Sequence, residues 1–73
     1  MKQLEILNDI EIYIPYRWRA NGYIGNYSAW FESDELNIQV PVYDASFDAV
    51  ALRNNLESFK DNHPEIKINI DIN

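Results

Sequence analysis

The first segment of the chain alternates apolar and polar positions, with an apolar side chain on most even numbers up to Pro15. A period of two is typical of a β-strand with one face in the core and one face in water. The proline ends the pattern. The sequence therefore predicts a first strand whose inward residues are Leu4, Ile6, Ile10, Ile12 and Ile14.

Two more strands are predicted in the middle of the chain. Asn21-Gly22 is a strong turn sequence and closes a connection over residues 16–22. The aromatic-rich stretch 23–32 predicts a second strand, and the alternation over 36–43 predicts a third. Because Pro41 cannot donate a ladder hydrogen bond, we expect the third strand at a sheet edge.

A helix and a last strand complete the pattern. Apolar residues recur every three or four positions from Ala49 to Phe59, as on one face of an amphipathic helix. Ser46 is a good N-cap, with Asp48 in the first turn, and Pro64 disfavours continuation of the helix. Residues 66–72 alternate isoleucine with polar side chains without a break, which predicts a final strand.

The predicted fold is α+β with element order β-β-β-α-β, as a single domain over residues 1–73. Three antiparallel strands form a meander, and one helix packs on one face of the sheet. The C-terminal strand lies beside the first, giving the spatial order 3-2-1-4. No repeat, linker or low-complexity tract divides the chain.

The chain is acidic, with 12 Asp and Glu against 6 Lys and Arg, for a net charge of −6 over 73 residues. Such a surface repels phosphates, so direct nucleic-acid binding is not expected. It suits a protein partner with a basic surface, of the kind found on nucleic-acid-handling complexes. The alternative is that the acidity only keeps a small domain soluble.

Several kinds of chemistry are disfavoured. His63 is the only histidine and there is no cysteine, so a catalytic triad and multi-histidine or thiolate metal sites cannot be assembled. We expect a capping role for His63 at the helix C-terminus. No apolar run approaches the ~20 residues of a membrane span, and the start lacks a signal-peptide core. The expectation is a cytoplasmic protein without enzyme activity, metal, cofactor or membrane partner.

Two surfaces are candidates for partner binding. The first is the loop Tyr16, Arg17, Trp18 and Arg19, extended by Trp30, since Tyr, Trp and Arg dominate interface hot spots. Its aromatic rings could instead pack over the open end of the core. The second is an acidic face that imitates the phosphate spacing of nucleic acid, formed by Glu32, Asp34, Glu35, Asp44 and Asp48.

The stretch Ile12-Tyr13-Ile14, then Asn21, Gly22 and Gly25, and finally Trp30-Phe31 resembles the opening of ArdA-type antirestriction proteins. Those proteins are acidic DNA mimics that open with a strand, an Asn/Gly turn and a Trp-containing second strand. The resemblance covers about residues 12–31 and implies a small anti-defence protein of a phage or mobile element. The matched positions are structural, so no functional residue is carried over.

The first functional hypothesis is a non-enzymatic, protein-binding inhibitor of the anti-restriction or anti-CRISPR kind, acting through its acidic face. The alternative is an immunity protein or antitoxin that neutralises one toxin. A third alternative is a self-associating structural module, such as a homodimer, because the final strand offers an open edge.

Overall fold

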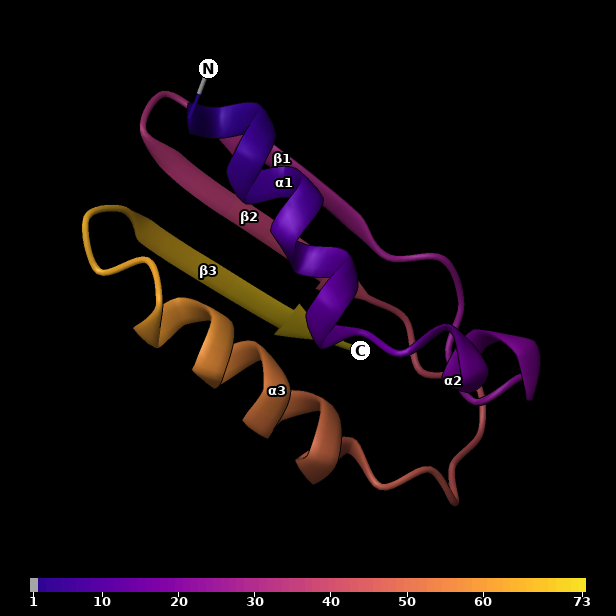
Figure 1. Ribbon diagram of the computed structural model, residues 1–73. Helices are drawn as coiled ribbons and strands as arrows, with labels where there is room; N and C mark the ends of the chain where they lie inside the picture. The colour runs from indigo at the N-terminus through magenta and orange to yellow at the C-terminus, as the bar shows by residue number, and fades with distance from the viewer. Residues whose placement is uncertain (1) are drawn as a thin grey trace.

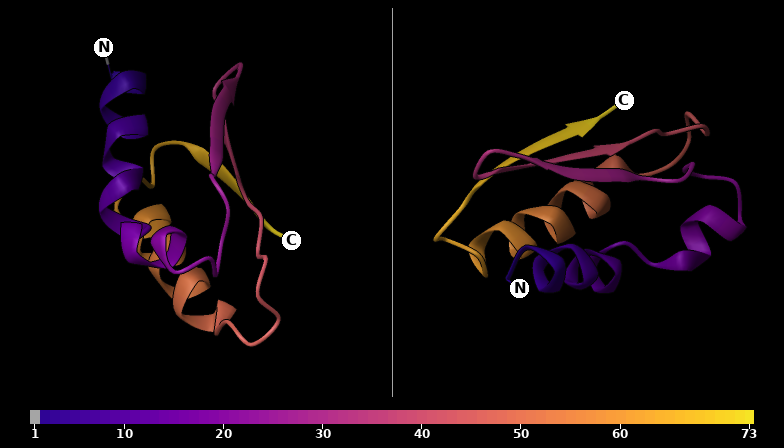
Figure 2. Two further views of the ribbon diagram at one scale, coloured as in Figure 1. Left: turned by 90° about the vertical axis from the view of Figure 1, so that its right-hand side faces the viewer. Right: turned by 90° about the horizontal axis from the view of Figure 1, so that it is seen from above.

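Two of the three helices lie on one face of a three-stranded sheet in the computed structural model, which describes residues 2–73, and the short helix of residues 16–20 lies beyond the end of the strands (Figure 1). Within the described residues, the opposite face of the sheet carries no helix (Figure 2, right). The α+β class is confirmed, whereas the β-β-β-α-β order with a single helix is wrong. In chain order the elements are α1 (Lys2–Tyr13), α2 (Tyr16–Ala20), β1 (Ser28–Glu32), β2 (Glu35–Val40), α3 (Ala49–Asp61) and β3 (Lys67–Ile72).

The predicted first strand is the helix α1. Within the alternating set, Ile6, Ile10 and Ile14 are spaced by four, so they share one face of a helix as well as one face of a strand. These three side chains are buried, whereas Leu4 and Ile12 are 61% and 75% exposed. The burial pattern therefore follows the helical period, and the strand prediction took the shared positions for a period of two.

The predicted connection 16–22 contains the short helix α2 and then a turn at Asn21-Gly22. The turn was predicted correctly. Gly22 has φ of 77°, a left-handed conformation that glycine adopts without steric cost. The chain then runs to β1, which covers only the second half of the predicted strand 23–32.

The sheet has the order β1-β2-β3 and is mixed. β1 and β2 form the expected antiparallel hairpin, in which Glu32 pairs with Glu35 across the turn Ser33-Asp34. β2 and β3 are parallel, with Leu36 opposite Ile68, and α3 connects them as a crossover. The predicted order 3-2-1-4 is wrong because its strand 1, predicted for the first segment of the chain, is the helix α1.

Pro41 does not mark an edge strand. β2 is the central strand, and Pro41 follows its last residue, Val40. On one side of the chain, the Val40 carbonyl accepts from Asn73 N–H and the Val42 N–H donates to the Asn73 carbonyl. On the other side, the Pro41 carbonyl accepts from Gly25 N–H. Since no partner there requires a donor, the missing N–H costs nothing.

α3 has the predicted apolar stripe but a different start. Leu52, Leu56 and Phe59 are buried against the sheet and α1. The N-cap is Asp48, whose carboxylate accepts from Val50 N–H at 3.0 Å, and not Ser46. Ser46 instead donates its hydroxyl to Asp44 at 2.7 Å, so it stabilises the turn that precedes α3.

One hydrophobic core lies between the helices and the sheet. The alternation predicted for the last strand is confirmed in β3, where Ile68 is buried and Lys67, Asn69 and Asp71 are exposed. None of the helices within residues 2–73 combines the length and hydrophobicity needed to cross a membrane. The fully or largely buried residues are Ile6, Ile10, Ile14, Ile24, Leu36, Ile38, Val40, Leu52, Leu56, Phe59 and Ile68.

Candidate functional site

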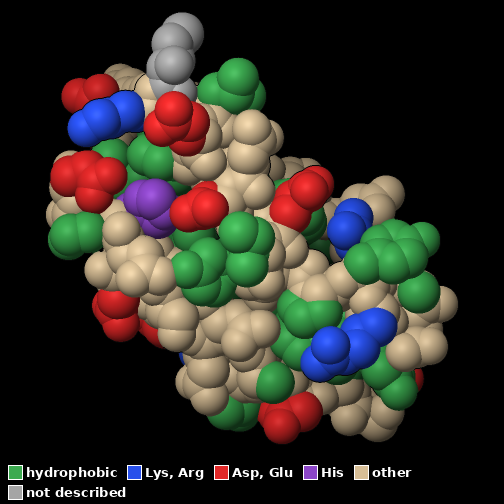
Figure 3. Space-filling model, in the orientation of Figure 1, with side chains coloured by type: hydrophobic (Ala, Val, Ile, Leu, Met, Phe, Trp, Pro, Cys, Tyr) green, Lys and Arg blue, Asp and Glu red, His purple; other side chains and the backbone are tan. Residues whose placement is uncertain are grey.

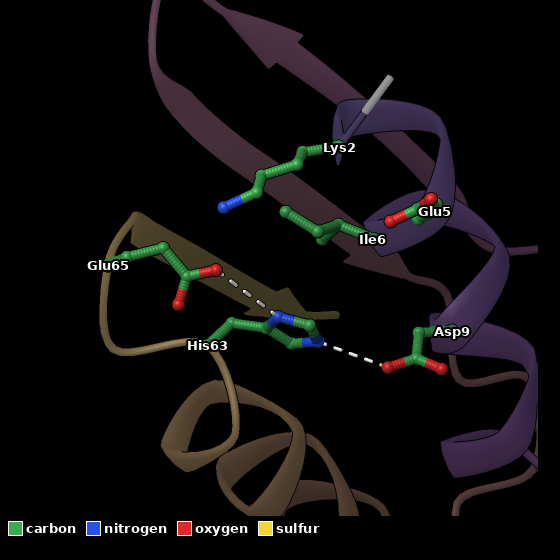
Figure 4. A pocket seen from close by; sticks show the side chains of 6 residues that line it. All are labelled: Lys2, Glu5, Ile6, Asp9, His63 and Glu65. Atoms are coloured by element: carbon green, nitrogen blue, oxygen red, sulfur yellow. Dashed lines mark hydrogen bonds and ion pairs between the residues drawn. The ribbon is translucent and has the colours of Figure 1, made fainter.

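A surface pocket of about 310 Å³ lies where the start of α1 faces the loop between α3 and β3 (Figure 4). The helix contributes its side chains at intervals of three and four residues, which places them on one side of α1. The loop contributes the only histidine. The lining residues are Lys2, Glu5, Ile6, Asp9, His63 and Glu65.

His63 forms the centre of this pocket. Its Nε2 lies 3.1 Å from an Asp9 carboxylate oxygen, and its Nδ1 lies 3.7 Å from Glu65. The other side of the ring packs on Phe59 with centroids 4.8 Å apart, and only 15% of the side chain is exposed. The ring therefore joins α1 to the loop before β3 through its contacts with two carboxylates.

The expected capping role of His63 is wrong for its side chain. The C-cap of α3 is Asn62, and the His63 backbone N–H donates to the Lys60 carbonyl at 3.1 Å. The imidazole turns toward α1 instead. The capping role was predicted from the position of His63 at the end of a helix and from the helix dipole. That prediction did not include Asp9, because Asp9 was assigned to a strand.

Acidic side chains surround the histidine (Figure 3). A neighbouring hollow of about 320 Å³ shares Lys2 and Glu65 with the pocket and adds Asp34 from the β1–β2 turn. Lys2 is the only Lys or Arg that lines either hollow. We use the term acidic pocket for Glu5, Asp9, His63, Glu65 and Asp34. Its charge suits a cationic group.

No group of three or more His, Cys, Asp or Glu side chains in residues 2–73 is arranged to hold a metal ion. The carboxylates are instead spread around the rim of a hollow that includes the apolar side chain of Ile6. A Lys or Arg side chain matches such a rim, because its apolar stem and charged head need different surroundings. The arrangement is thus suited to a basic side chain of another protein.

The predicted acidic face is divided by the structure. Glu32, Asp34 and Glu35 lie at the hairpin end of the sheet, whereas Asp44 and Asp48 follow the other end of β2 (Figure 1). The molecule extends 35 Å along its longest axis, so these two groups do not form one surface. Only the hairpin group lies next to the acidic pocket.

Asp44 and Asp48 have local structural roles. Asp44 accepts from both the hydroxyl and the backbone N–H of Ser46, at 2.7 and 2.9 Å. These two hydrogen bonds lower the pKa of Asp44, and the bond from the hydroxyl has the larger effect. Together with the N-cap at Asp48, they shape the approach to α3.

At the hairpin, two of the three acids have partners. Glu32 accepts from the Trp30 indole N–H at 3.0 Å. Glu35 lies 3.6 Å from Lys67 Nζ and accepts from the Asn69 amide at 3.2 Å. Asp34 forms no ion pair with any described residue, which leaves its carboxylate available.

The predicted aromatic loop is the helix α2. Trp18 packs edge-on against Phe47, with ring centroids 5.2 Å apart, so it covers the end of the core. Arg17 lies 5.8 Å from the Trp18 ring, and Tyr16 is 70% exposed. Arg19 lies over the rings of Tyr16 and Tyr27, at 5.1 and 5.7 Å.

Trp30 is separate from α2. It lies in β1 on the face of the sheet that no helix covers, and it is 37% exposed. Sequence reasoning grouped it with Tyr16–Arg19 because the predicted strand ran directly from that loop. It missed Lys2, Glu5, Asp9, His63 and Glu65. A helical reading of residues 2–13 would have placed Glu5 and Asp9 one turn apart on one face.

Comparison with known proteins gives no relative: no family model, curated protein or solved structure matches this chain. The segment that resembles the ArdA opening consists of the end of α1, α2, the Asn21-Gly22 turn and β1. Its first part is helical, where the resemblance implied a strand.

Proposed function

We propose that this chain is a non-enzymatic binding protein that inhibits a protein partner by docking its acidic pocket on a basic surface. The observation that carries the proposal is the convergence of Glu5, Asp9 and Glu65 around His63, with Asp34 beside them. A basic side chain entering this pocket would meet several carboxylates at once. Each charge-assisted hydrogen bond formed there would be stronger than a neutral one.

Electrostatics also supports a fast encounter. The net charge of −6 attracts a basic surface over a distance of about one Debye length, roughly 8 Å at physiological salt. The unpaired Asp34 stands at the tip of the hairpin, where a partner can reach it. We expect the hairpin and the start of α1 to make the first contacts.

The proposed biological setting is anti-defence. An acidic protein that occupies the nucleic-acid-binding groove of a protein complex prevents that complex from binding its nucleic acid. The ArdA resemblance of residues 12–31 implies the same mode of inhibition. An immunity protein or antitoxin would use the same pocket against a toxin. Competition separates the two, since duplex DNA or RNA displaces the protein only if the partner surface is a nucleic-acid groove.

The test compares two variants of equal charge. The pocket variant carries Glu5→Gln, Asp9→Asn, Asp34→Asn and Glu65→Gln, and its net charge falls in magnitude from −6 to −2. The control variant reaches the same charge through Glu11→Gln, Glu57→Gln, Asp61→Asn and Asp71→Asn. Both are immobilised and exposed to lysate of the cell that makes the protein.

We expect the wild type and the control variant to retain a partner that the pocket variant loses. The dissociation constant with the purified partner should rise at least about tenfold, because several rim contacts of about 1 kcal/mol or more disappear together. Equal retention by all three proteins would exclude the acidic pocket as the docking site.

A further inference from the structure

The outer edge of β1 has little of the protection that is usual for an edge strand. Its sequence is Ser28-Ala29-Trp30-Phe31-Glu32, with Glu32 as its only charged residue and without Lys or Pro, and no other strand of residues 2–73 pairs with it on that side. β3, the other edge strand, carries Lys67 and Asp71. Charged side chains on an edge oppose pairing with another chain, whereas an apolar edge invites it. β1 is therefore the edge at which we expect an added strand.

The direction of the free backbone groups follows from the hairpin. Glu32 and Glu35 flank a two-residue turn, and such flanking residues form a hydrogen-bonded pair. Alternation then directs the N–H and C=O groups of Trp30 toward β2. The corresponding groups of Ala29 and Phe31 point to the outer edge, where they need a partner or water.

A second copy of β1 satisfies these groups in an antiparallel register centred on Trp30. Ala29 of one copy then faces Phe31 of the other, and the four outward-pointing residues exchange hydrogen bonds. A small residue faces a large one on the inner side of the sheet, where Leu7 and Ala29 line a hollow of about 420 Å³. The Phe31 ring of the second copy enters this hollow. On the outer side the two Trp30 side chains lie opposite one another.

The charges at the two ends of β1 are complementary in the same register. The chain before β1 lies next to Arg19, which shares the hollow with Asn26 and Tyr27. The chain after β1 is the turn that carries Asp34. Antiparallel pairing places the beginning of one β1 beside the end of the other, so Asn26 of one copy faces Asp34 of the second.

Arg19 has no ion-pair partner among residues 2–73, and its Nε is buried without a hydrogen-bond acceptor. Its guanidinium is held between two tyrosine rings beside Glu11, the only acid that lines the hollow. Asp34 of the second copy would supply a second carboxylate. A planar guanidinium can bind both at once, because its donors diverge.

We propose that the protein forms a homodimer through β1, which joins two sheets into one of six strands with an Arg19–Asp34 ion pair at each end of the contact. The helix layer does not oppose this arrangement, since α1 lies on the inner side of the β1–β2 region and nothing is drawn beyond the edge of β1 (Figure 1). Asp34 belongs to both the acidic pocket and the dimer contact, whereas Glu5, Asp9 and Glu65 lie outside the dimer contact. The dimer is tested on the isolated protein, so its failure is distinguishable from a failure of the proposed inhibitory function.

The test is the mass of the isolated protein by sedimentation velocity, from about 1 µM to 1 mM. Mass should rise with concentration from 8.6 kDa to twice that value, 17.2 kDa. Trp30→Lys brings two ammonium groups together at the symmetry axis and should weaken association at least about tenfold. Asn69→Lys, on the same face of β3, adds the same charge and should leave association unchanged.

A charge exchange tests the register. Arg19→Asp and Asp34→Arg should each weaken the dimer, and the double variant should recover most of the affinity, because the pair is restored with its charges reversed. Circular dichroism confirms that each variant is folded. A mass of 8.6 kDa at every concentration would overturn the proposal, as would equal weakening by Asn69→Lys or a double variant without recovery.

Discussion

At the scale of single residues, side chains rather than backbone join the separate helices. Asn55 in α3 donates its amide to the Tyr13 carbonyl at 3.0 Å, and so satisfies a backbone group at the end of α1. Asp9 and His63 make a second link, from α1 to the loop that follows α3, one turn further from the α2 end. The acidic pocket is therefore placed by polar contacts that also orient α1 on α3.

The phenol of Tyr27 reports on the hollow beneath β1. Burial, and next the nearby Glu11, raise the pKa of Tyr27 above 10.0, while Arg19 acts in the opposite direction. A raised pKa means that the fold favours the neutral phenol, so this contribution to stability is complete below pH 10. It is lost as the pH rises through the pKa of the folded state.

We predict that Tyr27→Phe lowers the rise in absorbance at 295 nm that accompanies tyrosine ionisation, and that the loss lies above pH 10. The unfolding free energy of the variant should also fall less than that of the wild type between pH 9 and pH 11. Glu11→Gln should shift the Tyr27 pKa downward, since one cause of the increase is removed. Loss of amplitude at or below pH 10 would contradict the assignment.

The candidate site shows which residues sequence reasoning can and cannot find. Asp34 was found because a turn is defined by residues adjacent in the chain. Asp9 and His63 are separated by more than fifty positions, and their contact depends on how α1 packs against α3. Asp44 and Asp48 were assigned to the same face as Asp34, although the predicted strand 36–43 already separates them by its length.

At the scale of elements, the burial of α1 distinguishes between two readings of one apolar pattern. Apolar residues at positions 6, 10 and 14 fit both the helical period and the period of two of a strand. Residues 2–13 contain no threonine and no glycine, which would favour a strand and a hairpin turn. As a helix, the segment covers the sheet and buries three isoleucines. As a strand, it would have taken a place inside the sheet.

We predict that Asn8, an exposed residue in the middle of α1, distinguishes these states. Asn8→Pro should destabilise the protein by about 3 kcal/mol, because proline lacks the N–H and clashes with the preceding turn. Asn8→Ala should stabilise it by about 0.5 kcal/mol through helix propensity. Urea unfolding followed at 222 nm measures both. A destabilising alanine together with a tolerated proline would argue against a helix here.

The elements that were predicted well are those with strong local determinants. The β1–β2 hairpin follows from a short polar turn between two apolar stretches, and α3 follows from its stripe of Leu52, Leu56 and Phe59. The sheet order depends on long-range pairing. Once α1 was assigned to the sheet, β3 was placed beside it and not beside β2, so a single error in one element changed the whole topology.

At the scale of the whole molecule, charge is distributed unevenly along a body 35 Å long and 18 Å wide. The hairpin end holds the acidic pocket, and the α2 end holds Arg17 and Arg19. A symmetric antiparallel pair cancels this polarity, since each arginine end meets a hairpin end. The two proposed surfaces therefore use the same charges in different ways: one attracts a basic partner, and the other joins two copies of an acidic chain.

These two uses predict opposite responses to salt. Two copies, each with net charge −6, repel one another at a separation of about 18 Å. Raising the ionic strength from 0.01 M to 0.15 M shortens the Debye length from about 30 Å to about 8 Å, which screens that repulsion more than the short Arg19–Asp34 contact. We expect the dimer to tighten on the order of ten- to a hundred-fold over this range.

Binding of a basic partner at the acidic pocket should weaken over the same range, because there the long-range force is attractive. Sedimentation of the isolated protein gives the first salt dependence, and calorimetry with the purified partner gives the second. A variant with only Glu57→Gln, Asp61→Asn and Asp71→Asn, which keeps Glu11 beside Arg19 and has a net charge of −3, should show a flatter dimer response than the wild type, since like-charge repulsion scales with the product of the charges. Responses of the same sign would contradict the opposite long-range forces assigned to the two contacts.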